Sequence, residues 1–248
     1  MRGNRMLTTS KWIYEDLTHG LSTFGTMAFD GRFFYFADAE NIYIYSKNFE
    51  PLNCIKSAIK IAAMCYDSSD DCFWASNGKT DEIIKLNRRF EKTGQLTSGE
   101  AVYGLSYFCA HDTLLACTHS AVIEICKHGE KRIIHTAPKA SNAASAAPFF
   151  ALLQDRNSEQ IIRFYAPSEL HATLEAPPGY AIADILFYPP ENQIIALANS
   201  GKKVKILRHP MPCIDICCCN YSFDSCNEYC KWLLANTNCN SNWKAGLM

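Results

Sequence analysis

Short apolar runs that recur about every 40 residues constrain the fold of this chain more than any other feature of its sequence. Their centres are Phe34, Phe73, Leu115, Phe150, Ile195 and Leu234, and they lie 39, 42, 35, 45 and 39 residues apart. A period of about 40 residues is typical of the four-stranded blade of a β-propeller. The spacing therefore predicts six copies of one small antiparallel sheet.

Each unit repeats the same internal order of segments. In the first unit, the turn Phe29-Asp30-Gly31 precedes the central run, and the alternating run Ile42-Tyr43-Ile44-Tyr45 follows it. Aspartate and glycine favour chain reversal, and alternation of apolar and polar residues is typical of strands. Runs of small residues, such as Gly25 to Ala28 and Tyr103 to Ser106, stand ahead of the turns. Small side chains fit the crowded axis of a propeller, so these runs are predicted to be the inner strands.

The fold predicted from this pattern is all-β, a single six-bladed propeller domain over residues 1–248. Two segments depart from the repeat. The stretch from Lys139 to Ala147 is poor in β-branched residues, so we expect a helical or irregular segment there. The sixth unit ends with room for only one more strand after Asn240, and the segment from Lys11 to Leu17 is unassigned. We therefore expect this N-terminal strand to close the sixth blade.

Composition excludes several classes of function. The chain is 48% hydrophobic and 20% charged, as globular proteins are, and its 24 basic and 25 acidic residues give a formal net charge of −1. A surface with no excess of positive charge is poorly suited to neutralising a phosphate backbone, so no nucleic-acid partner is expected. No window approaches the roughly 20 apolar residues of a membrane span, and the first residues lack an apolar leader core. We therefore expect a soluble, cytoplasmic protein with no membrane partner.

Thirteen cysteines are many for such a protein, and we interpret most of them as reduced, small apolar residues. Cys72 and Cys117 lie inside central runs and are expected in the core. Cys213, Cys217, Cys226 and Cys230 have a spacing that superficially indicates zinc. On one strand, however, the first two would lie roughly 13 Å apart, too far to share an ion. A disulfide between the last two is the other possibility.

The chain resembles the six-bladed β-propeller superfamily, most nearly its NHL and YncE-like group. The matching stretches run from Phe73 to Asn87 and from Phe33 to Tyr45. More faintly, the cysteine-rich inner strands resemble those of uncharacterised propeller proteins from spore-forming gut bacteria. The first resemblance implies a six-bladed propeller, and the second implies no activity.

Sequence motifs for catalysis are missing. The chain has no nucleophile elbow, no phosphate-binding glycine loop and no histidine pair at metal-ligand spacing. The acidic turn from Asp67 to Asp71 offers carboxylates to a cation, but it lacks the aspartate spacing and glycine of a calcium loop. No cofactor is therefore expected for the main hypothesis.

We accordingly predict a non-enzymatic scaffold or binding module with a protein or small-molecule ligand. Its binding site is expected at the channel mouth, where the inner strands begin, and the candidate residues are Tyr103, Asn142, Tyr180 and Asp184. One alternative is a metal-dependent hydrolase or lyase similar to gluconolactonase, with a divalent cation held by Glu100, Asn142 and Asp184. The other alternative is a cysteine-cross-linked structural protein, as in a spore coat.

Overall fold

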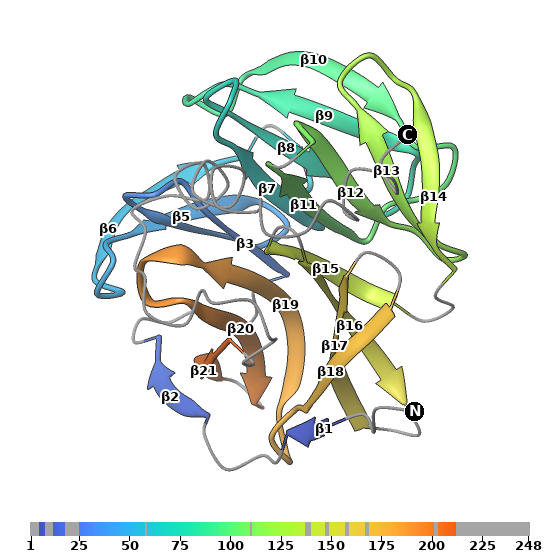
Figure 1. The fold of residues 1–248 in the computed structure, drawn as a ribbon. Coiled ribbons are helices and arrows are strands. Elements are labelled where there is room, and N and C mark those ends of the chain that lie inside the picture. The colour runs from blue at the N-terminus through green and yellow to red at the C-terminus, as the bar shows by residue number, and fades with distance from the viewer. Residues whose placement is uncertain are drawn as a thin grey trace.

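The computed structural model describes residues 5–7, 12–17, 25–57, 59–109, 111–136, 140–146, 149–156, 159–166, 169–200 and 203–211. Its strands form five sheets that are arranged around a common centre as the blades of a β-propeller (Figure 1). Apart from one single-turn 3-10 helix, η1 (Pro189–Glu191), the described residues contain no helix. None of the described residues forms a helix that could cross a membrane.

The strands are described by their layer within a blade, in the order of blades one to five. The innermost strands are β3 (Thr26–Phe29), β7 (Ala63–Asp67), β11 (Gly104–Phe108), β15 (Ala140–Ala146) and β19 (Ala181–Tyr188). The second strands are β4 (Phe34–Ala37), β8 (Cys72–Ser76), β12 (Thr113–Cys117), β16 (Phe149–Arg156) and β20 (Gln193–Ser200). The third strands are β5 (Asn41–Tyr45), β9 (Glu82–Leu86), β13 (Val122–Cys126), β17 (Glu159–Ala166) and β21 (Lys203–Pro210). The outer strands are β6 (Pro51–Lys56), β10 (Lys92–Thr97), β14 (Lys131–His135), β18 (Glu169–Glu175) and β2 (Ile13–Asp16).

The propeller has five blades, so the prediction of six was wrong. Each innermost strand packs against the innermost strand of the next blade, and β19 packs against β3. That last contact closes the ring, so the five blades formed by the described residues leave no gap for a sixth. The first five predicted central runs are the second strands of these blades. The sixth run, around Leu234, lies outside the described residues.

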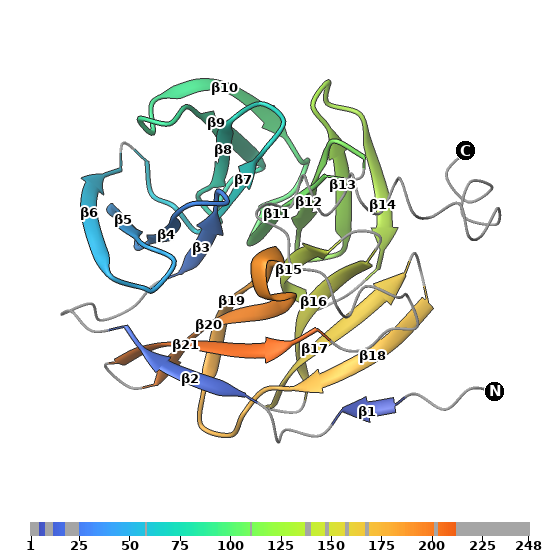
Figure 2. The same cartoon turned by 60° about the vertical axis from the view of Figure 1, so that its left-hand side comes forward.

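The N-terminal strand closes a blade as predicted, but it is the fifth blade and not a sixth. Strand β2 pairs antiparallel with β21, with Ile13 opposite Arg208 and Tyr14 opposite Leu207. The fifth unit supplies only the inner three strands of its sheet, so the start of the chain provides the fourth. A further short strand, β1 (Arg5–Leu7), joins β18 in parallel and gives the fourth blade a fifth strand (Figure 2).

The hydrophobic core lies between the blades, because each sheet packs both faces against its neighbours. Phe34 and Tyr188, with ring centroids 5.4 Å apart, fill the gap between blades one and five. Tyr35 and Phe73, 4.7 Å apart, do the same between blades one and two. This packing fixes the positions of the inner strands, which line the axis.

The fourth unit does form a regular inner strand, contrary to the expectation of a helical or irregular segment. Strand β15 pairs antiparallel with β16 along its whole length, with one register shift between Ala140 and Asn142. Ala143 and Ala144 are buried in the core cluster of this blade. Low intrinsic β-propensity is overridden here, because the hub favours small side chains and the neighbouring strand supplies the hydrogen bonds.

Candidate functional site

A cavity of about 50 Å³ lies on the axis, at the end where the inner strands finish. All five innermost strands contribute to its wall, and the turns that follow β3 and β7, together with Pro189, form its rim. Met27, Met64, Leu105 and Ile185 make much of the wall apolar. The cavity is thus built jointly by all the blades.

Two hydroxyls beside this cavity have no hydrogen-bond partner among the described residues. Ser145 on β15 lines the cavity and is only 4% exposed, and its Oγ makes no hydrogen bond. The backbone N–H of the same residue donates to Ser106 Oγ on β11 at 2.8 Å. The Oγ of Ser68, at the rim, is also buried and unpaired. Both oxygens are fully buried, so they are closed to a molecule in the cavity.

Nearer the other end of the axis, each inner strand has a corresponding position that pairs with the second strand of its blade. These positions are Thr26, Ala63, Gly104, Asn142 and Asp184. All of them except Ala63 contact one another between blades. Asn142 Nδ2 donates to Asp184, and a Cβ on Gly104 would lie only 2.7 Å from the Oδ1 of Asn142. Glycine at this position therefore makes room for the asparagine of the next blade.

Asp184 accepts four hydrogen bonds at this hub. Its Oδ2 accepts from Thr26 Oγ1 at 2.7 Å and from the N–H of Met27 at 2.6 Å. Its Oδ1 accepts from Asn142 and from the N–H of Ile185 at 2.7 Å. Burial raises the pKa of Asp184 to about 7, and the four donors act against this rise. The hydrogen bonds join blades four, five and one, so the carboxylate serves to hold the ring closed.

The four residues predicted for the ligand site are distributed between this hub and the surface. Asn142 and Asp184 are brought together, but both are buried and bonded to each other. Tyr103 is 45% exposed. Tyr180 packs against Tyr14 of β2, with ring centroids 5.5 Å apart. None of the four lines the axial cavity, which opens at the opposite end of the inner strands.

The residues of the lactonase-like alternative are placed in different environments. Glu100 is exposed, and both of its carboxylate oxygens accept from Ser120 Oγ at 2.8 Å. Asp184 is buried with all its acceptor positions occupied by protein donors. Because Glu100 is bound at the surface, it does not complete a cation site with Asn142 and Asp184.

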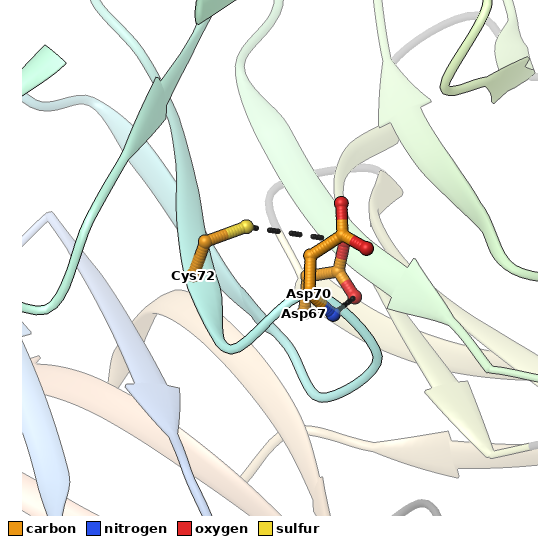
Figure 3. Close-up of side chains that lie close together, drawn as sticks. All are labelled: Asp67, Asp70 and Cys72. Atoms are coloured by element: carbon orange, nitrogen blue, oxygen red, sulfur yellow. Dashed lines mark hydrogen bonds between the residues drawn. The ribbon is translucent and has the colours of Figure 1, made fainter. Parts of the chain in front are cut away.

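The acidic turn after β7 has the geometry of a cation site, and a lysine ammonium fills it. Ligand atoms of Asp67, Asp70 and Cys72 lie within 4.8 Å of one another (Figure 3). Lys127 from blade three brings its Nζ to 2.8 Å from Asp67 Oδ2 and to 3.2 Å from Asp70 Oδ1. Lys85 Nζ lies 2.6 Å from Asp70 Oδ2. The carboxylates are thus neutralised by the protein itself.

The same contact recurs between blades one and two. Arg88 follows β9 at the position that Lys127 has after β13, in a turn with the same backbone hydrogen bonds. Its guanidinium pairs with Asp30 of blade one and, at 2.6 Å, with Asp71 of its own blade. Asp30 and Asp67 both end the inner-strand segment of their blades. These two interblade ion pairs flank the rim of the axial cavity.

Five of the six cysteines among the described residues are free, namely Cys54, Cys65, Cys72, Cys117 and Cys126. Cys72 and Cys117 are buried in the core, as predicted. Cys109 is disulfide-bonded, so the interpretation of reduced thiols does not extend to it. The cysteines proposed for zinc or for a disulfide, Cys213, Cys217, Cys226 and Cys230, lie outside the described residues.

Comparison with known proteins identifies a fold and no family. No protein-family model and no curated protein sequence matches the chain. Among solved structures, glutaminyl cyclase of Myxococcus xanthus is similar with a TM-score of 0.62 and 8% identity, covering 83% of this chain and 97% of that one. The RRP9 WD40 repeats are similar with a TM-score of 0.51 and 10% identity, covering 78% and 96%.

Hydrazine synthase of Kuenenia stuttgartiensis is also similar, with a TM-score of 0.51 and 10% identity. The match covers 73% of this chain and 56% of the hydrazine synthase chain. This chain is a β-propeller. The three names describe proteins of different kinds, namely a hydrazine synthase, a glutaminyl cyclase and a set of WD40 repeats. At such low sequence identity the likeness shows the fold alone.

Proposed function

We propose that this propeller is a non-enzymatic binding module whose ligand enters the axial cavity at the end of the inner strands. The observation that carries the proposal is a cavity on the axis that is walled by the innermost strands of all five blades, with Ser145 of β15 among its lining residues.

The environment of the ionisable groups favours binding over catalysis. A general acid or base needs a free proton-transfer position toward the substrate. Asp30, which lines the cavity, accepts from the N–H groups of Arg32 and Phe33 and from the hydroxyl of Tyr35, and it pairs with Arg88. Burial and the nearby acid Asp67 raise the pKa of the Cys65 thiol, which keeps it in the unreactive neutral form.

The proposal is tested with Ser145→Val, which adds bulk in the cavity, and Ser120→Val, which makes the same change on the surface. Immobilised wild type and variants are incubated with the small-molecule and peptide fraction of a cell extract, and mass spectrometry identifies what each retains. We expect compounds retained by the wild type and by Ser120→Val but lost from Ser145→Val, and recovered chemically unchanged. Equal retention by both variants contradicts a cavity site.

The same experiment separates the alternatives of the sequence analysis. Recovery of a converted compound, with conversion that depends on added divalent cation, supports the lactonase-like enzyme. Retention that disappears only when reductant is added, together with intermolecular disulfides on a non-reducing gel, supports a cross-linked structural protein. Neither result is expected for a ligand that is held in the axial cavity without chemical change.

A further inference from the structure

Asp184 is a buried carboxylate without a positive charge beside it. It is 2% exposed and lies on β19, which packs most extensively against β20 of its own blade, β15 of blade four and β3 of blade one. Asp184 has the only charged side chain on these four strands. The thiols of Cys65 on β7 and Cys117 on β12 lie close enough for its charge to act on them, but burial raises the pKa of both and keeps them neutral. A change of charge at the hub near neutral pH therefore involves Asp184 itself.

The hydrogen bonds at Oδ1 of Asp184 fit a carboxylate and leave no place for a proton. This oxygen accepts from Asn142 Nδ2 and from the N–H of Ile185 at 2.7 Å. Both partners are nitrogen donors, so neither can accept from an O–H group. Asn142 is held in this orientation, because its own Oδ1 accepts from the N–H of Ala143 at 2.6 Å. A proton on Oδ1 of Asp184 would thus face two other donors.

At Oδ2, one partner of Asp184 is able to accept. This oxygen accepts from the N–H of Met27 at 2.6 Å and from Thr26 Oγ1 at 2.7 Å, and a hydroxyl both donates and accepts. A proton taken up from solvent therefore forms an O–H bond at Oδ2 and is donated to Thr26, whose own hydroxyl hydrogen must turn away from Asp184. The bonds from the three nitrogen donors then lose their charge assistance, which makes a hydrogen bond about twice as strong as a neutral one.

The groups that respond to this change line the axial cavity. Met27 and Ile185, whose N–H groups bond to Asp184, both belong to its wall. Thr26 Oγ1 also accepts from the N–H of Met64 at 3.0 Å, and Met64 lines the same wall. The carboxyl group is thus connected to the cavity wall directly in blades one and five, and through Thr26 in blade two.

We propose that Asp184 is a proton-sensitive joint of the ring, and that gain or loss of its proton shifts the wall of the axial cavity. Burial without a counter-ion raises the pKa of Asp184 to about 7, although the four donors act against this rise. Both forms are thus populated at neutral pH. An exposed aspartate has a pKa of about 3.9, so the contribution of Asp184 to stability decreases as the pH rises from about 4 to above 7. This behaviour needs no ligand and does not rest on the proposed binding function.

The test is NMR of the full chain labelled with 13C at the aspartate carboxyl carbons and the methionine methyl groups, between pH 5 and pH 9. Asp184→Asn, Met27→Leu and Met64→Leu assign the signals. We expect the carboxyl carbon of Asp184 to titrate with a midpoint within about one unit of pH 7, and the methyl signals of Met27 and Met64 to follow the same midpoint. In Asp184→Asn, which carries no titrating group at this position, the two methyl transitions should vanish.

Asn142→Ala gives a second variant, because it removes one donor that favours the charged form of Asp184. It is expected to raise the midpoint by about one pH unit or more. Ser145→Ala is the matched control on the same strand, since the Ser145 hydroxyl makes no hydrogen bond, and it should leave the midpoint unchanged.

Three results would overturn the proposal. A carboxyl signal of Asp184 that stays in its charged position down to pH 5 means that the joint carries no proton near neutrality. Titration of Asp184 without any change in the two methyl signals means that its proton does not affect the cavity wall. Methyl transitions that persist in Asp184→Asn belong to another group, such as a histidine. Should Asp184→Asn fail to fold, an unchanged midpoint in Asn142→Ala overturns the proposal in its place.

Discussion

Replacing Gly104 by alanine tests whether crowding at the hub sets the arrangement of the inner strands. An ideal Cβ at this position would lie 2.7 Å from the Cα of Asn142 and 2.7 Å from its Oδ1. Carbon atoms in favourable contact are roughly 3.5–4.0 Å apart, so β11 and β15 must separate to admit the methyl group. The clash involves backbone, and rotation of a side chain therefore does not relieve it.

The expected cost has two parts. Overpacking of a well-packed interior costs about 1–3 kcal/mol. Displacing Asn142 also weakens its hydrogen bond to Asp184, and bonds to charged groups contribute about 1.5–3 kcal/mol. We expect Gly104→Ala to lower the free energy of unfolding by about 2–5 kcal/mol. At about 2–4 °C per kcal/mol for a chain of this length, Tm falls by roughly 4–20 °C.

Gly25→Ala is the matched control, because Gly25 directly precedes β3 as Gly104 begins β11. Its added Cβ would have its nearest neighbour, the carbonyl oxygen of Ala62, at 3.8 Å, an ordinary contact. Its φ lies outside the left-handed region, so alanine fits without strain and is expected to stabilise by about 0.4–1 kcal/mol. Differential scanning calorimetry and urea titration measure both variants. Equal and small effects at the two positions would refute the crowded hub.

Two further predictions concern ionic groups. Lys127→Met leaves the buried carboxylate of Asp67 without its ammonium partner, and we expect it to lower the free energy of unfolding, measured by urea titration, by about 3–5 kcal/mol. The double variant Lys127→Met/Asp67→Asn is expected to lose less than the sum of the two single variants. An additive double variant would mean that the pair is not coupled. Burial acts to raise the pKa of Glu124, but hydrogen bonds from His111, Thr113 and Arg132 prevail and lower it to about 2. Glu124→Gln should therefore lose about 1–3 kcal/mol at pH 7, with the deficit shrinking between about pH 4.5 and pH 2; a deficit that is constant across that range would contradict the assignment.

The blade pattern was accessible from the sequence because it depends on local features. Burial of a whole strand favours consecutive apolar residues, which Phe34 to Ala37 and Cys72 to Ala75 supply. Turn residues such as Asp30 and Gly31 mark the reversals between strands. Small residues at the inner strands reflect crowding that recurs in every blade. These signals persist in each unit, so their period predicts the fold class.

The number of blades was not accessible in the same way. It depends on whether β19 packs against β3 and on where the N-terminal strand pairs, and both contacts join distant parts of the chain. Six apolar runs, the last around Leu234, predicted six units with a period of about 40 residues. The pairing of Tyr14 with Leu207 assigns the spare strand to the fifth unit instead. A repeat length alone contains no information about which unit needs that strand.

Sequence reasoning found part of the hub and missed the cavity. Asn142 and Asp184 stood out because polar residues at the start of small-residue strands are conspicuous. Ser145 did not stand out, because in an alanine-rich stretch it has the appearance of one more small residue. Its place in the wall of the axial cavity is revealed only by the three-dimensional arrangement. Lys127 and Arg88 had a fainter signal, a basic residue at the same place in two successive turns.

The hub also explains how similar blades find their correct neighbours. Thr26, Gly104, Asn142 and Asp184 occupy corresponding positions, yet each is suited only to the blade beside it. Asn142 needs the space left by Gly104 on one side and the carboxylate of Asp184 on the other. Exchanging two inner strands would bury Asp184 without its donors from blades one and four or force a side chain into the place of glycine, and both changes are strongly unfavourable. One divergent position per repeat thus specifies the order of the blades.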